Sequence, residues 1–131
     1  MHRPGKQSAA AQRAAERRAR EDSAPRLAAE VPDLRSLRFE IEERSGSMAV
    51  MQPRYIRRIV VPHAPALFLV PCGDSNCTDG GHDVTGAVIQ ALRSHRARFT
   101  GDEGCRGSLG SGAACNRVLH YDAFAEYTQT A

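Results

Sequence analysis

The chain has 131 residues, of which 41% are apolar and 25% are charged, so it is long enough for one domain and too short for two. Its net charge of +3 comes from residues 1–30, because the remaining residues contain equal numbers of basic and acidic side chains. No apolar run approaches the roughly 20 residues of a membrane-spanning helix, and the N-terminus lacks the apolar segment of a secretory signal. We therefore expect a cytoplasmic protein that does not enter the membrane and whose thiols stay reduced.

Residues 1–30 are predicted to form a flexible basic arm. The segment "SAAAQRAAERRARED" is rich in Ala and Arg, which favour helix, but it has no apolar stripe to pack against a domain. A short isolated helix is only marginally stable in water. The arm is either a solvated tail or a segment that becomes ordered on an acidic partner such as RNA, DNA or the ribosome. The side chains expected to contribute are Arg13, Arg17, Arg18 and Arg20.

Residues 31–131 are predicted to form the folded domain, which begins with three strands. Leu37, Phe39 and Ile41 alternate with charged residues, a pattern that indicates a half-buried strand. The segment "RYIRRIVVP" (54–62) is rich in β-branched residues and predicts a second strand. The continuous apolar run "ALFLV" (66–70) predicts a short buried strand, and we expect it to form a hairpin with the second.

A helix and a final strand complete the predicted domain. Apolar residues recur with helical spacing in "DVTGAVIQALRSHRARF", with Asp83 as the expected N-cap and Gly101 beyond the end. In "NRVLHYDAFAEY" (116–127), apolar side chains alternate with polar ones, as in a strand. The predicted class is α+β: a small, mostly antiparallel sheet in the order β-β-β-α-β with one packed helix. The pattern leaves open whether the last strand is parallel or antiparallel to its neighbours.

Four cysteines and one histidine are the candidate metal ligands. Zinc binds four thiolates tetrahedrally, and ligand pairs from two separate loops commonly hold it. Here the spacings are Cys-x4-Cys, at the edge of the common range of about two to four residues, and Cys-x9-Cys, which is long. The predicted structural zinc site consists of Cys72, Cys77, Cys105 and Cys115, with His82 as the reserve ligand.

Chain geometry tests whether the two cysteine pairs can meet. The predicted helix carries the chain roughly 20 Å away from Cys77. The segment from Arg98 to Gly104 can return about 23 Å when it is fully extended. A shared site therefore requires an extended return, and it places the last strand antiparallel to "ALFLV". The alternative is a crossover that leaves the two cysteine pairs at opposite ends of the sheet. We prefer the shared site, because the Gly-rich loop is longer than a crossover needs.

Other uses of the four thiols remain open. Cys72–Cys77 and Cys105–Cys115 disulfides would each close a small loop, and small loops contribute least to stability. An iron–sulfur cluster also takes four thiolates, which makes a redox protein the main alternative. A zinc enzyme is a third possibility, but it needs an open coordination position and a general acid or base.

A second basic feature lies in the predicted second strand. In "PRYIRR", three arginines surround Tyr55, and arginine beside an aromatic ring on a sheet can bind and stack on nucleic acid. These arginines are Arg54, Arg57 and Arg58. The sequence therefore favours a non-enzymatic, zinc-stabilised binding module, acting as an accessory or regulatory factor on nucleic acid, the ribosome or a protein.

Overall fold

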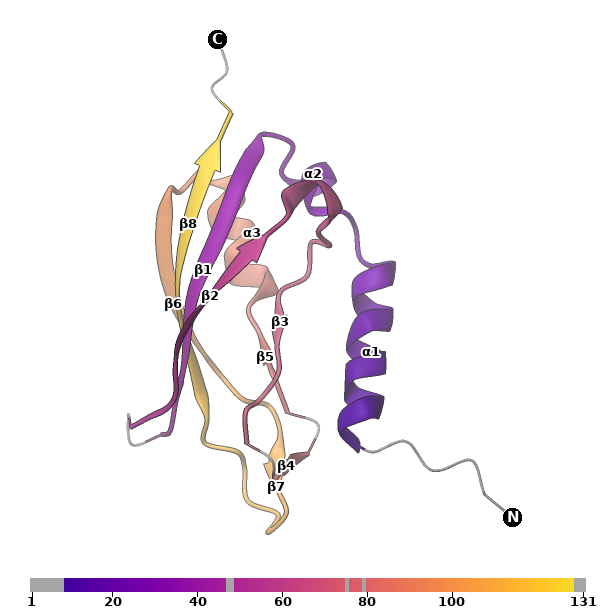
Figure 1. The fold of residues 1–131 in the computed structure, drawn as a ribbon, viewed down its shortest axis with the longest axis vertical. Coiled ribbons are helices and arrows are strands. Elements are labelled where there is room, and N and C mark those ends of the chain that lie inside the picture. Colours follow the sequence, from indigo (N-terminus) through magenta and orange to yellow (C-terminus); the bar gives the residue numbers. More distant parts are fainter. Residues whose placement is uncertain (1–8, 47–48, 75, 79, 129–131) are drawn as a thin grey trace, which may run out of the picture.

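The fold is built on a four-stranded antiparallel sheet. The computed structural model describes residues 9–46, 49–74, 76–78 and 80–128. The strand order in the sheet is β2-β1-β8-β6, so the two long strands β1 and β8 are central (Figure 1). The bounds of the four strands are Leu34–Arg44 for β1, Val50–Ile59 for β2, Arg98–Gly104 for β6 and Val118–Tyr127 for β8.

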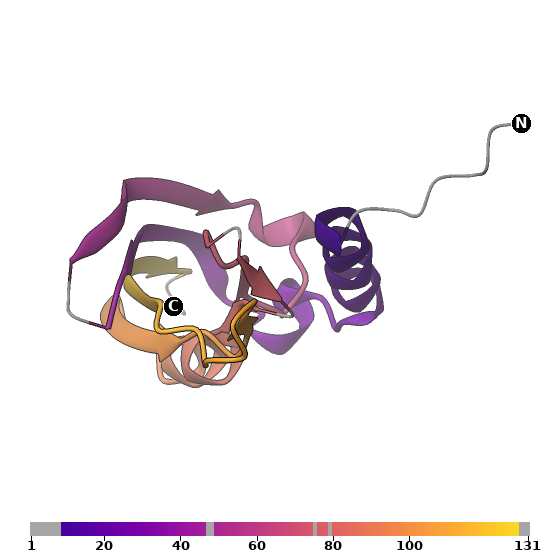
Figure 2. The ribbon, with the colours of Figure 1, turned by 90° about the horizontal axis from the view of Figure 1, so that it is seen from below.

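Helices and short strand pairs lie beside this sheet, which is curved (Figure 2), and α3 (Thr85–Arg93) leads into its edge strand β6. Two helices, α1 (Ala9–Ser23) and α2 (Leu27–Glu30), precede β1, and a 3₁₀ turn, η1 (Val61–His63), follows β2. Two small antiparallel pairs are formed by β3 with β5 and by β4 with β7. Their bounds are Leu69–Val70 for β3, Cys77–Thr78 for β4, His82–Asp83 for β5 and Ser108–Leu109 for β7.

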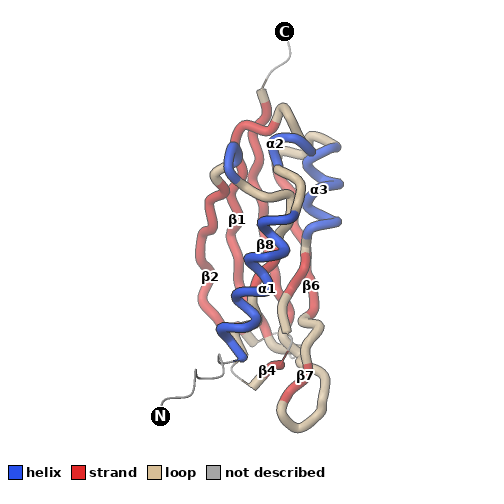
Figure 3. The backbone as a smooth tube through the Cα atoms, turned by 90° about the vertical axis from the view of Figure 1, so that its right-hand side faces the viewer, coloured by secondary structure: helices blue, strands red, loops and turns tan. Residues whose placement is uncertain are grey.

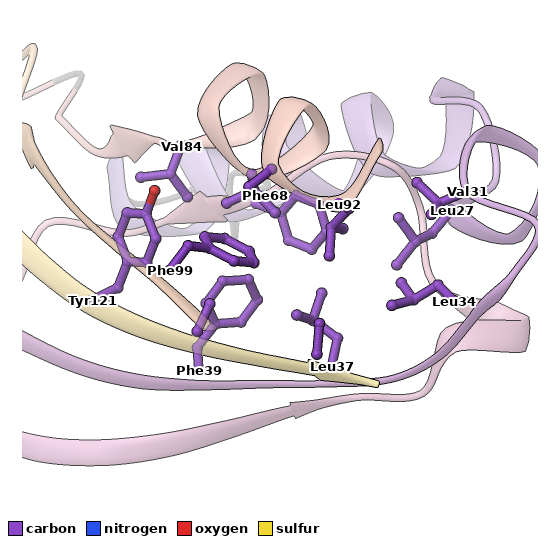
Figure 4. Packing of buried hydrophobic residues seen from close by; sticks show 14 of the residues in the cluster. Leu27, Val31, Leu34, Leu37, Phe39, Phe68, Val84, Leu92, Phe99 and Tyr121 are labelled. Atoms are coloured by element: carbon purple, nitrogen blue, oxygen red, sulfur yellow. The ribbon is translucent and has the colours of Figure 1, made fainter. Parts of the chain in front are cut away.

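The core lies between one face of the sheet and α3. Strand alternation turns Leu37, Phe39 and Ile41 of β1 toward this core, as predicted, and all three are buried. The Phe39 ring packs against those of Phe68 and Tyr121, at centroid distances of 5.6 and 5.9 Å. Figure 4 shows these side chains between the sheet and the helix, with further apolar residues from α2 and α3 closing the layer.

The predicted α+β class with a small antiparallel sheet and few helices is confirmed, but the order β-β-β-α-β is wrong in detail. The strand at 54–62 pairs with β1 and not with "ALFLV", so the predicted hairpin is absent. Only Leu69 and Val70 of the apolar run are in a strand, and they pair with β5. The run is apolar because Phe68 and Val70 enter the core, whereas it contributes nothing to the main sheet.

The segment from Arg98 to Gly104 is a strand that the sequence analysis treated only as a connection. It forms β6 and pairs antiparallel with β8. Its glycines and charges hid this role, since only Phe99 is buried along it. The last strand is antiparallel to both of its neighbours, which answers the question that the pattern left open.

The predicted helix is shorter at both ends than the apolar spacing indicated. It begins at Thr85, and the Asp83 carboxylate accepts a hydrogen bond from the Thr85 amide at 3.0 Å. It ends at Arg93, well before Gly101, and His95 follows with a φ of 55°. This left-handed conformation stops the helix, as a residue just beyond a helix C-terminus often does.

The predicted arm contains α1, and the folded core begins within it. Residues 1–8 lie outside the described residues. Leu27 in α2 is completely buried, and its amide donates a hydrogen bond to the Ala64 carbonyl at 2.9 Å. The core therefore starts before the predicted boundary at residue 31. Figure 3 shows α1 running beside the body of the protein. None of the helices described here is both long enough and apolar enough to cross a bilayer.

Candidate metal centre

The four cysteines lie together at one end of the protein. One sulfur atom from each of Cys72, Cys77, Cys105 and Cys115 lies within 4.8 Å of all the others. The closest contacts join the two loops: Cys72 Sγ is 3.8 Å from Cys115 Sγ, and Cys77 Sγ is 3.6 Å from Cys105 Sγ. The two cysteine pairs therefore meet, as the chain geometry predicted, and their thiols can hold a metal ion.

These distances fit a single tetrahedral ion. A metal bound to four sulfurs at about 2.3 Å has sulfur–sulfur edges of about 3.8 Å. A disulfide requires about 2.05 Å, and all four cysteines are free thiols. The disulfides considered from the sequence, Cys72–Cys77 and Cys105–Cys115, also join the wrong partners, because the shortest contacts run between the loops.

Backbone pairing brings the two loops together. Strand β4 pairs with β7 from the second loop (Figure 1), and Cys77 on β4 lies opposite Leu109 on β7. In the second loop, the Cys105 amide donates to the Arg117 carbonyl and the Cys115 amide donates to the Gly107 carbonyl, both at 2.9 Å. Strand β6 supplies the extended return that precedes Cys105.

Backbone amides also point at the sulfurs. The amides of Gly81 and Gly107 donate to Cys105 Sγ at 3.3 and 3.4 Å, and the Asp74 amide donates to Cys72 Sγ at 3.5 Å. Burial acts to raise the pKa of the Cys105 thiol, but hydrogen bonds from the Gly107 and Gly81 amides and from the Cys77 and Cys72 thiols together lower the pKa below its usual value. Amide donors of this kind stabilise thiolate, the form that binds metal.

The other shifted thiols resist ionisation in the metal-free protein. Burial raises the pKa of Cys77 to about 12 and raises that of Cys72 further. Four thiolates this close together repel one another unless a cation lies between them. A metal ion held between the four sulfurs would supply such a cation, and its binding would release protons from the thiols.

Two glycines are required by the close packing around the sulfurs. A Cβ atom on Gly80 would lie closer than 3.0 Å to the sulfurs of both Cys77 and Cys105. A Cβ atom on Gly107 would meet Cys77 Sγ and the backbone of Gly80 and Thr78 just as closely. The backbone of one loop thus passes directly against the sulfurs of the other, which only glycine permits.

A buried charged network anchors the first cysteine loop to the sheet. Glu43 on β1 is 1% exposed and contacts three groups among the described residues. Its Oε2 accepts from the Gly73 amide at 3.1 Å and lies 3.1 Å from His82 Nε2, and its Oε1 accepts from Arg117 Nη1 at 2.9 Å. The sequence analysis missed Glu43, although strand alternation after Leu37, Phe39 and Ile41 places it on the buried face.

His82 belongs to this network, which bears on its predicted role as the reserve ligand. Its ring is 1% exposed, and Nδ1 donates to the Glu103 carbonyl at 2.9 Å while Nε2 faces Glu43. Although Glu43, Cys72 and His82 also lie within 4.8 Å of one another, both ring nitrogens of His82 are already hydrogen-bonded. The four sulfurs are therefore the donor set that remains available.

Of the predicted nucleic-acid-binding residues, three lie next to this centre. Arg13, Arg17 and Arg20 of α1 line a cavity of about 390 Å³ whose opposite wall includes Cys72 and Cys77. Arg18 does not line this cavity and is exposed on α1.

The arginines of β2 do not form one basic patch. Arg54 pairs with Glu40 and Asp122 at 3.2 and 2.8 Å, so its charge is largely compensated. Arg57 lies opposite Phe39 on the core side of the strand and donates to the Leu69 carbonyl at 3.3 Å, whereas Arg58 lies opposite Arg38.

Comparisons of the chain with protein-family models, curated proteins and solved structures gave no significant match. The functional assignment therefore depends on the geometry of this chain.

Proposed function

We propose that the chain is a non-enzymatic binding protein whose cysteine loops are held together by a structural zinc ion. The observation that carries this proposal is the convergence of four free thiols at the spacing of a single tetrahedral ion. Four sulfurs fill the coordination of zinc and leave no position for a substrate or a reactive water, unlike a catalytic site with three protein ligands.

The sulfur spacing favours one ion over an iron–sulfur cluster, the redox alternative. A cluster must fit several irons and inorganic sulfides between its thiolates, so its cysteine sulfurs must be farther apart than those around one ion. All the sulfurs here lie within 4.8 Å of one another. Among single ions, zinc has no redox chemistry and is the usual occupant of four-cysteine structural sites.

The partner we propose is nucleic acid, bound with the help of α1. The described part of α1 carries four arginines, and only Arg20 makes an ion pair, with Asp83 at 3.7 Å. Arg13 and Arg17, which line the cavity and are half-buried, have no carboxylate partner among the residues described, whereas Arg18 lies outside the cavity. Unpaired arginines on one helix are suited to phosphate, which the planar guanidinium binds with two hydrogen bonds.

Elemental analysis of the purified protein, together with titration of accessible thiols, tests the metal assignment. We expect one zinc per chain and four protected thiols, with Cys115→Ser losing the zinc and His120→Ala retaining it. His120 is the control because it lies on β8, where it is 2.7 Å from Asp102 and has no contact with the sulfurs. Iron would instead support the redox alternative, and four reactive thiols without metal would contradict both.

A further inference from the structure

The face of α1 that is turned toward the cysteine loops is charged, which is unusual for a helix beside a folded domain. Arg13, Glu16, Arg17 and Arg20 recur with the spacing of one helix face and line the cavity described above. A helix packed on a domain ordinarily turns an apolar stripe inward. Here Arg13 and Arg17 are half-buried on that face, yet within the described structure neither has an acidic partner.

A fourth arginine reaches the same cavity from a distant part of the chain. Arg106 follows β6 and lines the cavity with the α1 residues, and its only acidic contact among the described residues is with Glu103 at 4.0 Å. We call this space, bounded by Arg13, Arg17, Arg20 and Arg106, the arginine cleft. Its volume of about 390 Å³ is in the range of small-molecule sites.

The acidic groups at the cleft leave two arginines uncompensated. Asp83 is paired with Arg20 at 3.7 Å, and Glu16 is exposed. Zinc with four thiolates would add two formal negative charges at the opposite wall, although amide donors to the sulfurs already spread that charge. The long-range electrostatic attraction of the cleft for an anion is therefore weak. Direct hydrogen bonds from the guanidinium groups of α1 select the anion instead.

We infer that the arginine cleft binds a phosphate group, held between Arg13 and Arg17 of α1 and Arg106 of the second cysteine loop. This inference rests on the proposed function, since it names the place where a phosphate of the nucleic-acid backbone binds. A guanidinium group binds phosphate oxygens with two hydrogen bonds, and the cleft brings such groups from two elements to one cavity. The same chemistry accepts a mononucleotide, so the source of the phosphate is decided by experiment.

Fluorescence anisotropy with a labelled oligo(dT) strand tests the site, using the full-length zinc-loaded protein at one salt concentration. We expect Arg17→Gln and Arg106→Gln each to weaken binding about tenfold, because each removes charged hydrogen bonds to phosphate. Arg18→Gln is the matched control on the same helix and should change the affinity less than about twofold. If Arg17→Gln and Arg18→Gln lose the same affinity for oligo(dT) and Arg106→Gln loses none, the cleft is not the phosphate site. The proposal that the protein binds nucleic acid would then still hold.

Calorimetric titration with AMP and with inorganic phosphate shows whether the bound phosphate comes from a nucleic-acid strand or from a small molecule. AMP or phosphate binding that is lost in Arg17→Gln and Arg106→Gln but kept in Arg18→Gln supports the cleft, even if the strand does not bind. In that outcome the nucleic-acid proposal falls and the ligand is a small phosphate compound. If the wild-type protein binds none of the three probes, both the cleft and the proposed partner are wrong.

Discussion

Replacing Gly80 by Ala is the sharpest test of how tightly the two cysteine loops pack around a metal. The added methyl group would lie closer than 3.0 Å to the sulfurs of both Cys77 and Cys105. In the metal-bound protein those sulfurs cannot retreat, because the ion fixes their positions. The backbone at Gly80 has to move instead, and the methyl group cannot be placed without displacing one loop from the other.

The size of the effect follows from the cost of overpacking a closed site. Inserting a methyl group into well-packed structure typically costs about 1–3 kcal/mol. Without metal the loops can relax, so this cost falls on the bound state and lowers zinc affinity by about 5- to 150-fold. Competition of the protein with a chromogenic zinc chelator at fixed pH measures the change directly.

Gly110→Ala is the matched control, because it makes the same substitution in the second cysteine loop. No heavy atom lies within 4 Å of a Cβ built at Gly110. We expect zinc affinity within about twofold of wild type for this variant. Unchanged zinc affinity in Gly80→Ala would refute the packing argument, and it would mean that the sulfurs are not held by an ion at the observed spacing.

Three further substitutions test the parts of the fold that support the site. Glu43→Gln should lower the free energy of unfolding by about 3 kcal/mol in urea titrations, because it removes the acidic partner of buried His82 and of Arg117. A loss below about 1 kcal/mol would show that this network does not stabilise the fold. Gly86→Ala should raise the free energy of unfolding by about 0.5–1 kcal/mol, since the new methyl group meets no neighbour and alanine favours helix; a destabilised variant would count against the start of α3 at Thr85. Burial acts to raise the pKa of the Asp122 carboxyl, but hydrogen bonds from Arg54 and Thr100 and the nearby positive charge of Arg54 help to lower it below its usual value. The stabilisation from the Asp122 carboxylate is therefore present at neutral pH and is lost as the pH falls through the folded-state pKa. Asp122→Asn should therefore be less stable than wild type by about 1 kcal/mol or less at neutral pH. In acid well below the folded-state pKa of Asp122, the two proteins should be equally stable in urea unfolding, and a difference that persists there would contradict this.

The alternation of apolar and charged residues predicted the two central strands. The reach of the extended segment 98–104 predicted that the two cysteine pairs come together. Leu37, Phe39 and Ile41 are buried because a strand with one face on a core must alternate. The cysteine loops meet because the segment at 98–104 is extended, as the distance argument required. Both conclusions depend only on the side-chain alternation of a strand and on the maximum reach of an extended segment, so they could be drawn from the sequence alone.

Strand pairing was not predictable in the same way. The run at 66–70 is apolar because it enters the core, and that signal is the same for a buried strand and a buried loop. Strand β6 could not be predicted for the opposite reason: only Phe99 among its residues is buried, so the strand has almost no apolar pattern. Glu43 was predictable from alternation alone, but a charged residue at an inward position is rare enough to be passed over.

The cysteine loops lie outside the apolar core, which has a consequence for metal removal. The cluster of buried apolar side chains contains none of the four cysteines. Where the loops are described, they are joined to the sheet through Glu43 and to each other by the two-residue strands β4 and β7. A chelator should therefore unfold the loops locally while the sheet keeps its structure.

Hydrogen exchange with and without a chelator measures this separation. The amides of Gly81 and Gly107 donate to Cys105 Sγ, so we expect both to lose protection when the metal is removed. Amides in β1 and β8 should exchange at the same rate in both conditions, because their ladder and core contacts do not involve the metal. Loss of protection throughout β1 and β8 would show instead that the ion is required for the whole fold. Unchanged protection at Gly81 and Gly107 would mean that the loops keep their structure without any metal, and the thiols would then require another role.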